Sequence, residues 1–147
     1  MVGVRFSRFA EEKSMELADS LVGKLRESPR TVAYRGLDDE DLRADLREFF
    51  QELTGWLLYR GQADIEASYT QQGMRRASQG VPLDQCVNAM LVCRDHLVQY
   101  LLREPTWDAE LFGELEFVVA VNHFFDDAIF FQMLGHRKYE GNAERVA

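Results

Sequence analysis

The sequence predicts an all-α protein, a single globin-like or up-and-down bundle of about five helices. Apolar residues recur at steps of three and four along almost every segment, which is typical of helices with one buried face. No segment shows the clean alternation of apolar and polar residues that half-buried strands need. The 147 residues fit one domain, and a content of 46% hydrophobic and 29% charged residues is that of a folded protein.

The first predicted helix covers residues 7–27, with Ser7 as its N-cap, and a connector of residues 28–37 follows. Asp38 is a strong N-cap for the second helix, because further acidic residues follow it at the positive helix end. This helix extends to about Gly61. Both helices carry an apolar line at helical spacing: Ala10, Ser14, Leu17, Leu21 and Leu25 in the first, and Leu42, Leu46, Phe49, Leu53 and Leu57 in the second.

The third predicted helix, residues 62–79, is the most polar of the five. Glycine inside a helix costs about 1 kcal/mol relative to alanine. Gly73 therefore predicts a close crossing with another helix, which offsets that cost. Arg75 and Arg76 are interpreted as part of the solvated face. The predicted inward line consists of Ile65, Tyr69, Gly73 and Ala77.

A tight corner follows at Gly80 and Pro82. Gly80 suits the left-handed position just after a helix, and Pro82 suits the first turn of the next helix, where no amide donor is needed. The fourth predicted helix then covers residues 82–103 and is apolar on two adjoining stripes.

The fifth predicted helix covers residues 109–139, with Asp108 as its N-cap, and residues 140–147 form an exit segment toward a possible effector. This helix is apolar in nearly all directions, so it is buried in the bundle, in a dimer interface, or in both. The alternative to a dimer is that the first helix covers the remaining face. The predicted homodimer interface consists of Phe124, Ile129, Phe130, Phe131 and Leu134.

Charge and hydropathy indicate the compartment and exclude some partners. A net charge of -8 argues against nucleic-acid binding, because a phosphate backbone would be repelled. The longest uncharged apolar stretch near the C-terminus, residues 117–125, is far shorter than the roughly 20 residues of a membrane span. The first residues lack the apolar core of a signal peptide. We therefore predict a cytoplasmic protein without a membrane partner. Cys86 and Cys93 lie seven residues apart on one predicted helix, which is too far for a disulfide, so both are predicted to be reduced.

Candidate sites for chemistry are sparse. His96, and His123 with Asp127 one helical turn later, are weak candidates for a metal or haem ligand. Nucleophile and phosphate-binding motifs are lacking, so we predict a protein that is not an enzyme and needs no cofactor. A haem- or metal-binding globin-like sensor is the alternative. If a small ligand is sensed, its pocket is predicted between the fourth and fifth helices, lined by Met90, Cys93, Leu97, Phe117, Val121 and Phe125.

One stretch, residues 73–83, resembles the signature of a known family. It carries Arg76-Ala77 and then Gly80-Val81-Pro82-Leu83, which opens a helix continuing as Asn88 to Arg94. The pattern is similar to the N-terminal sensory domain of RsbT co-antagonist proteins of the RsbRD type, also found ahead of bacterial sensor histidine kinases and PucR-like regulators. The resemblance covers about residues 30–140. It implies a dimeric, all-helical, non-enzymatic input domain of a cytoplasmic signalling protein, and it supplies no catalytic residues.

Overall fold

A computed structural model describes residues 2–59, 63–103 and 114–146. Five α-helices and a short 3-10 helix account for most of these residues: α1 (Val2–Glu27), η1 (Val32–Gly36), α2 (Asp39–Tyr59), α3 (Ala63–Ser78), α4 (Leu83–Arg103) and α6 (Glu114–Val146). Within the described ranges no β-strand occurs. The prediction of an all-α bundle of about five helices is confirmed.

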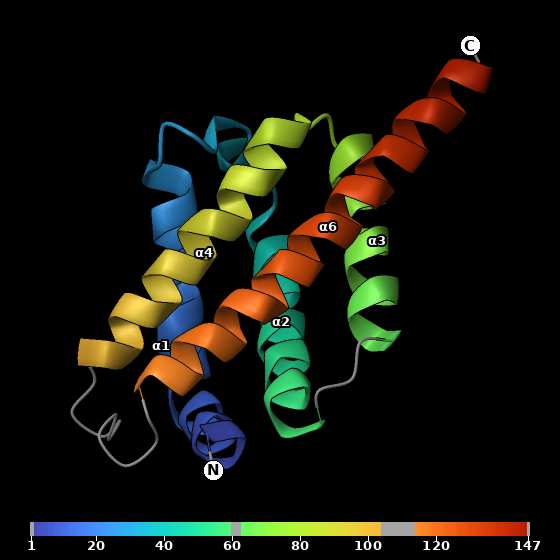
Figure 1. Ribbon diagram of the computed structural model, residues 1–147. Helices are drawn as coiled ribbons and strands as arrows, with labels where there is room; N and C mark the ends of the chain where they lie inside the picture. The colour runs from blue at the N-terminus through green and yellow to red at the C-terminus, as the bar shows by residue number, and fades with distance from the viewer. Residues whose placement is uncertain (1, 60–62, 104–113, 147) are drawn as a thin grey trace.

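Successive helices run in alternating directions, as in an up-and-down bundle (Figure 1). α1 packs on α2 and α4, while α6 packs on α4 and, most extensively, along α3. The core is aromatic where these layers meet. Phe124 of α6 lies at its centre, with its ring centroid 5.9 Å from Phe49 of α2, 5.9 Å from Tyr69 of α3 and 5.5 Å from Phe125.

α1 begins at Val2, so the prediction that Ser7 caps this helix is wrong. The reason is apolar burial before Ser7. Phe6, which precedes Ser7, is fully buried in the core, with its ring centroid 6.4 Å from that of Phe117. Burying a phenylalanine stabilises the fold by about 1.5–3 kcal/mol, more than a capping hydrogen bond contributes, so the helix extends over Phe6.

The predicted turn residues are confirmed at two corners. The carboxylate of Asp38 accepts hydrogen bonds from the backbone N–H of Glu40 and Asp41, at 2.8 and 3.3 Å, and so caps α2. Gly80 has φ = +79°. Its N–H donates to the Ala77 carbonyl and the Val81 N–H to the Arg76 carbonyl, both at 3.0 Å, which is the Schellman ending of α3.

The start of α4 is one residue later than predicted. Pro82 lies just before the helix, at the N-cap position, and its carbonyl accepts the first helical hydrogen bond from Cys86 at 3.1 Å.

The connector after α1, predicted as residues 28–37, contains η1.

α6 is longer at its C-terminus than predicted, since it continues as helix through most of the predicted exit segment to Val146. Its last turns extend beyond the other helices (Figure 1), and residues 137–143 are all exposed. The predicted cap Asp108 lies outside the described residues.

Among the described helices one stretch, Glu116–Ala143 of α6, is long and apolar enough by composition to cross a membrane, with a mean hydropathy of 1.3. A core helix of a soluble protein passes the same criterion. Here the inner side of the stretch packs on α3 and carries buried Gln132 and His136. These polar side chains would be costly to place in hydrocarbon.

Candidate functional site

α3 and α6 cross at two glycines, with backbone against backbone. A Cβ on Gly73 would overlap the carbonyl oxygen of Gln132, and a Cβ on Gly135 would overlap the carbonyl oxygen of Thr70. The predicted close crossing at Gly73 is therefore confirmed. The consequence is that α6 is held against α3 with no side chain between them at this point.

Beside this crossing lies a cavity of about 40 Å³. Its wall is apolar on most sides and polar toward α3 and the middle of α6. Lining residues come from η1 and from all five described α-helices: Leu25, Tyr34, Leu42, Asp45, Leu46, Phe49, Tyr69, Gln72, Arg76, Ala89, Met90, Cys93, Phe125 and Gln132.

Arg76 carries the more deeply buried of the two charged side chains that line this cavity, since it is only 3% exposed. Its guanidinium forms a short ion pair with Asp45 of α2, and a second nitrogen donates to Gln79 Oε1 at 2.9 Å. Burial acts to lower the pKa of Arg76, but Asp45 and Tyr34 outweigh it, so the pKa is raised and the charge is retained. The prediction that Arg76 lies on a solvated face is wrong, because a paired arginine tolerates burial.

Asp45 joins α2 to α3, since its carboxylate pairs with Arg75 as well as with Arg76. It is 12% exposed, whereas Arg75 is 41% exposed. Arg75 thus matches its predicted position on the solvated side, and Asp45 lies at the boundary between solvent and cavity.

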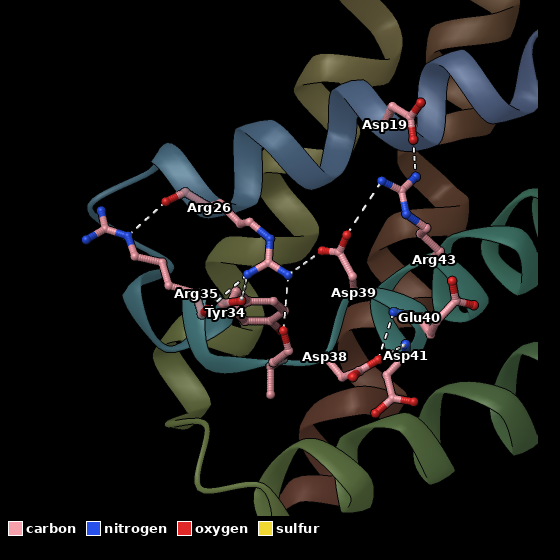
Figure 2. A network of polar contacts seen from close by, with 10 residues as sticks. Asp19, Arg26, Tyr34, Arg35, Asp38, Asp39, Glu40, Asp41 and Arg43 are labelled. Atoms are coloured by element: carbon pink, nitrogen blue, oxygen red, sulfur yellow. Dashed lines mark hydrogen bonds and ion pairs between the residues drawn. The ribbon is translucent and has the colours of Figure 1, made fainter.

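Tyr34 is placed in the cavity wall by a polar network between α1, η1 and α2 (Figure 2). The guanidinium of Arg26 donates to the carbonyls of Tyr34, Arg35 and Leu37, at 3.3, 2.9 and 3.1 Å, and pairs with Asp39 at 2.6 Å. These bonds hold η1 against the end of α1. The guanidinium carbon of Arg76 then lies 5.5 Å from the centre of the Tyr34 ring, within the range of a cation–π contact.

Both cysteines are buried and unbridged on α4. Burial raises the pKa of the Cys93 thiol, which lines the cavity, to about 12, although Arg76 acts to lower it. Burial likewise raises the pKa of Cys86 to about 11. Since the thiolate is the reactive form, neither thiol is an activated nucleophile at neutral pH.

Three of the six predicted pocket residues line this cavity: Met90, Cys93 and Phe125. The other three, Leu97, Phe117 and Val121, do not line it and are fully buried in the core. The prediction located the pocket between α4 and α6 alone. The polar side, with Tyr69 and Arg76 on α3, was missed. Their spacing from Gly73, at i−4 and i+3, places both on the inward face of α3 and was the available signal.

The residues predicted for a dimer interface divide into two groups. Phe124 is fully enclosed by its own chain, so its assignment to an interface surface is wrong. Phe130 is 57% exposed, and it is therefore not covered by α1 as the alternative required. Ile129, Phe131 and Leu134 are half-buried beside it. For these four residues the interface remains a prediction.

The two histidines predicted as weak metal or haem ligands, His96 and His123, do not line the cavity. His96 Nε2 lies 2.6 Å from Ser20 Oγ and links α4 to α1. His123 is exposed on α6 with Asp127 half-buried one turn later. Within the described part of the chain no group of three metal-ligating side chains occurs. A volume of about 40 Å³ is also far below the roughly 300–1,000 Å³ of typical cofactor pockets.

His136 was not singled out by the sequence, yet it is fully buried. Its Nε2 donates to the Val81 carbonyl at 2.7 Å, so the imidazole fastens α6 to the corner between α3 and α4. Its Nδ1 lies 3.4 Å from Glu140. This hydrogen bond joins α6, one turn beyond Gln132, to the corner at Gly80 and Pro82.

No curated protein and no solved structure matches the chain significantly. A family model, however, matches residues 15–144, under the description RsbT co-antagonist protein rsbRD N-terminal domain. The match begins about 15 residues before the predicted resemblance and so includes much of α1. It also contains all of the residues that line the cavity. The chain belongs to the family of RsbT co-antagonist protein rsbRD N-terminal domains.

Proposed function

We propose that this regulatory domain of signal transduction is a non-enzymatic, cytoplasmic input module that acts as a homodimer through α6. Membership of the family supports the regulatory role. The observation that supports a role as an input module acting through α6 is the path of this helix through the molecule. This single helix passes from the aromatic core at Phe124, along the cavity at Gln132, to the exposed residues 137–143.

A continuous helix is suited to transmit a change in the core to an effector. Helices in packed proteins shift as rigid bodies by small rotations or translations. Because Gly73 and Gly135 hold the backbones of α3 and α6 in contact, a change at this crossing displaces α6 as a whole. The exposed end of α6 is then the part that an effector domain or a signalling partner reads.

The proposed dimer surface, the α6 patch, comprises Ile129, Phe130, Phe131, Met133 and Leu134. These residues are consecutive but for Gln132 and all are at least partly exposed. Apolar patches of this kind on a soluble protein mark interaction sites. A second copy of the chain is the favoured occupant, because a two-fold axis covers the same residues on both chains at once.

The absence of catalysis and the cytoplasmic location are supported by the site itself. Both thiols have a raised pKa, and the two charged groups that line the cavity, Arg76 and Asp45, are paired with each other. Gln132 and His136 inside α6 favour an aqueous bundle over a membrane span.

The haem- or metal-binding alternative is tested by the visible absorption spectrum and metal content of the purified protein. We expect no Soret band and no stoichiometric metal, because His96 is bonded to Ser20 and His123 faces solvent. A Soret band or one iron per chain would replace the proposal by that alternative.

The dimer is tested by chemical cross-linking of Phe130→Cys with a short bismaleimide at micromolar concentration. Met15→Cys is the matched control, because Met15 is 82% exposed on α1, outside the α6 patch. Cys86 and Cys93 react slowly in both variants, since burial raises the pKa of each. We expect efficient dimer formation with Phe130→Cys alone. Equal, low cross-linking of both variants would contradict the proposal.

A further inference from the structure

Three buried polar atoms of residues that line the central cavity have no hydrogen-bond partner within the described part of the chain. They are Tyr69 Oη, Arg76 Nε and Gln132 Oε1. The residues are 3%, 2% and 1% exposed, so solvent at the surface does not satisfy them. An unsatisfied buried polar group costs about 1–3 kcal/mol, and native proteins rarely leave several around one cavity.

The three atoms define what a bound molecule must offer. Arg76 Nε–H needs an acceptor, Gln132 Oε1 needs a donor, and Tyr69 Oη can do either. The nitrogen of the same side-chain amide already has a partner, since Gln132 Nε2 donates to Gln72 Oε1 at 2.8 Å. A molecule that only accepts, or only donates, leaves at least one of the three unsatisfied.

The charges around the cavity favour an uncharged occupant. The guanidinium of Arg76 is neutralised by Asp45. Burial raises the pKa of Tyr69 well above its ordinary value, and Glu52, Glu48 and Asp45 add to that effect. An anion in the cavity would therefore be repelled by these carboxylates, of which Asp45 lines the wall, and would find the arginine already neutralised. A cation offers no acceptor to Arg76.

The size and access of the cavity limit the occupant further. A volume of about 40 Å³ holds about three water molecules, or one organic molecule of comparable size. The lining residues are buried except for Asp45 and Gln72, which are partly exposed. The wall of the cavity is therefore closest to solvent at Asp45 and Gln72. Met90 and Phe125 supply an apolar wall for a small hydrocarbon part.

We propose that this cavity binds a small uncharged molecule that both donates and accepts hydrogen bonds, of the amide or urea class. Its carbonyl oxygen accepts from Arg76 Nε–H, its N–H donates to Gln132 Oε1, and Tyr69 contributes the third hydrogen bond. The binding stands on the cavity alone. That this molecule is also the sensed signal rests on the proposed function, in which α6 transmits the signal. The molecule would contact both helices of the crossing, because Gln132 is on α6 and Tyr69 and Arg76 are on α3.

The experiment is an NMR titration of the ¹⁵N-labelled protein with acetamide, observed at the Arg76 Nε–H signal. In the wild type we expect a saturable shift. In Tyr69→Phe, which removes the hydroxyl but keeps the ring against Phe124, we expect an affinity about three- to tenfold weaker, as the loss of one hydrogen bond implies. Gln71→Ala, an exposed residue of the same helix, is the control and should bind as the wild type does.

A linear, unsaturable response that is identical in all three proteins would overturn the proposal and leave water as the only occupant. If Tyr69→Phe does not fold, Gln132→Leu removes the acceptor at similar side-chain volume and is expected to weaken binding likewise. A failure of binding leaves the homodimer proposal standing, because cross-linking at Phe130 tests that separately.

Discussion

At the scale of single residues, a buried ion pair joins α2 to α3: the Arg76 side chain is 3% exposed and pairs with Asp45. Arg76 lies three residues after Gly73 and so beside the inward line of α3, yet an arginine is ordinarily expected in solvent. What decides its burial is Asp45, which lies 31 residues earlier on another helix. Local spacing does not reveal such a partner. The capping role of Asp38 was predictable because donors and acceptor are only two or three residues apart.

Replacing Asp45 by alanine leaves the Arg76 guanidinium buried without its counter-charge. We expect a loss of about 3 kcal/mol in the free energy of unfolding, measured by urea denaturation. Asp19→Ala is the control, because its ion pair with Arg43 is solvent-exposed and the loss should be much smaller. Similar losses in the two variants would show that Arg76 is not held as described.

His96 makes stability depend on pH. Partial burial, with Lys24 and Arg103 nearby, lowers the pKa of His96 below its ordinary value. The unfolded chain then binds a proton more readily than the folded protein, so this residue's contribution to stability is lost as the pH falls through about 6.5. In His96→Gln the loss of stability between about pH 7.5 and 5.5 should be smaller than in the wild type. An unchanged pH profile, measured by thermal denaturation, would contradict this assignment.

At the scale of the helices, the apolar periodicity of the sequence predicted which helices exist and in what order, but it did not predict every helix end. The interiors follow from apolar lines such as Leu42 to Leu57, which are buried as expected. α1 begins earlier because Phe6 is buried against Phe117, a residue distant in sequence. α6 continues beyond 139 although that part is exposed, because nothing in it breaks a helix strongly.

The crossing of α3 and α6 gives a sharp prediction. Gly73→Ala places a methyl group against the backbone of Gln132, so the helices must separate. We expect a loss of about 1–3 kcal/mol in the free energy of unfolding by urea denaturation. The control is Gly23→Ala in α1, where a Cβ meets nothing within 4 Å. Alanine has a higher helix propensity than glycine, so the control substitution should stabilise the protein by up to about 1 kcal/mol. Equal effects at the two positions would exclude the tight crossing.

At the scale of the whole molecule, the cavity and the assembly depend on how distant elements meet. The sequence predicted Met90, Cys93 and Phe125 as pocket residues because they share stripes on two helices. It did not indicate that Tyr34 on η1 and Asp45 on α2 complete the wall, since nothing local fixes where those elements pack. The apolar excess of the fifth helix was visible in the sequence, and in the structure Phe130 of the α6 patch is the most exposed of the large apolar residues described on this helix.

The proposed homodimer is tested most directly by sedimentation equilibrium of the wild type and Phe130→Glu at micromolar concentration. We expect a mass near twice 17.0 kDa for the wild type and near 17.0 kDa for the variant, because the added carboxylate would be buried at a two-fold interface. Met15→Glu should sediment as the wild type does, since Met15 lies outside the α6 patch. A wild-type monomer of 17.0 kDa that Phe130→Glu leaves unchanged would contradict the central claim that α6 acts through a homodimer.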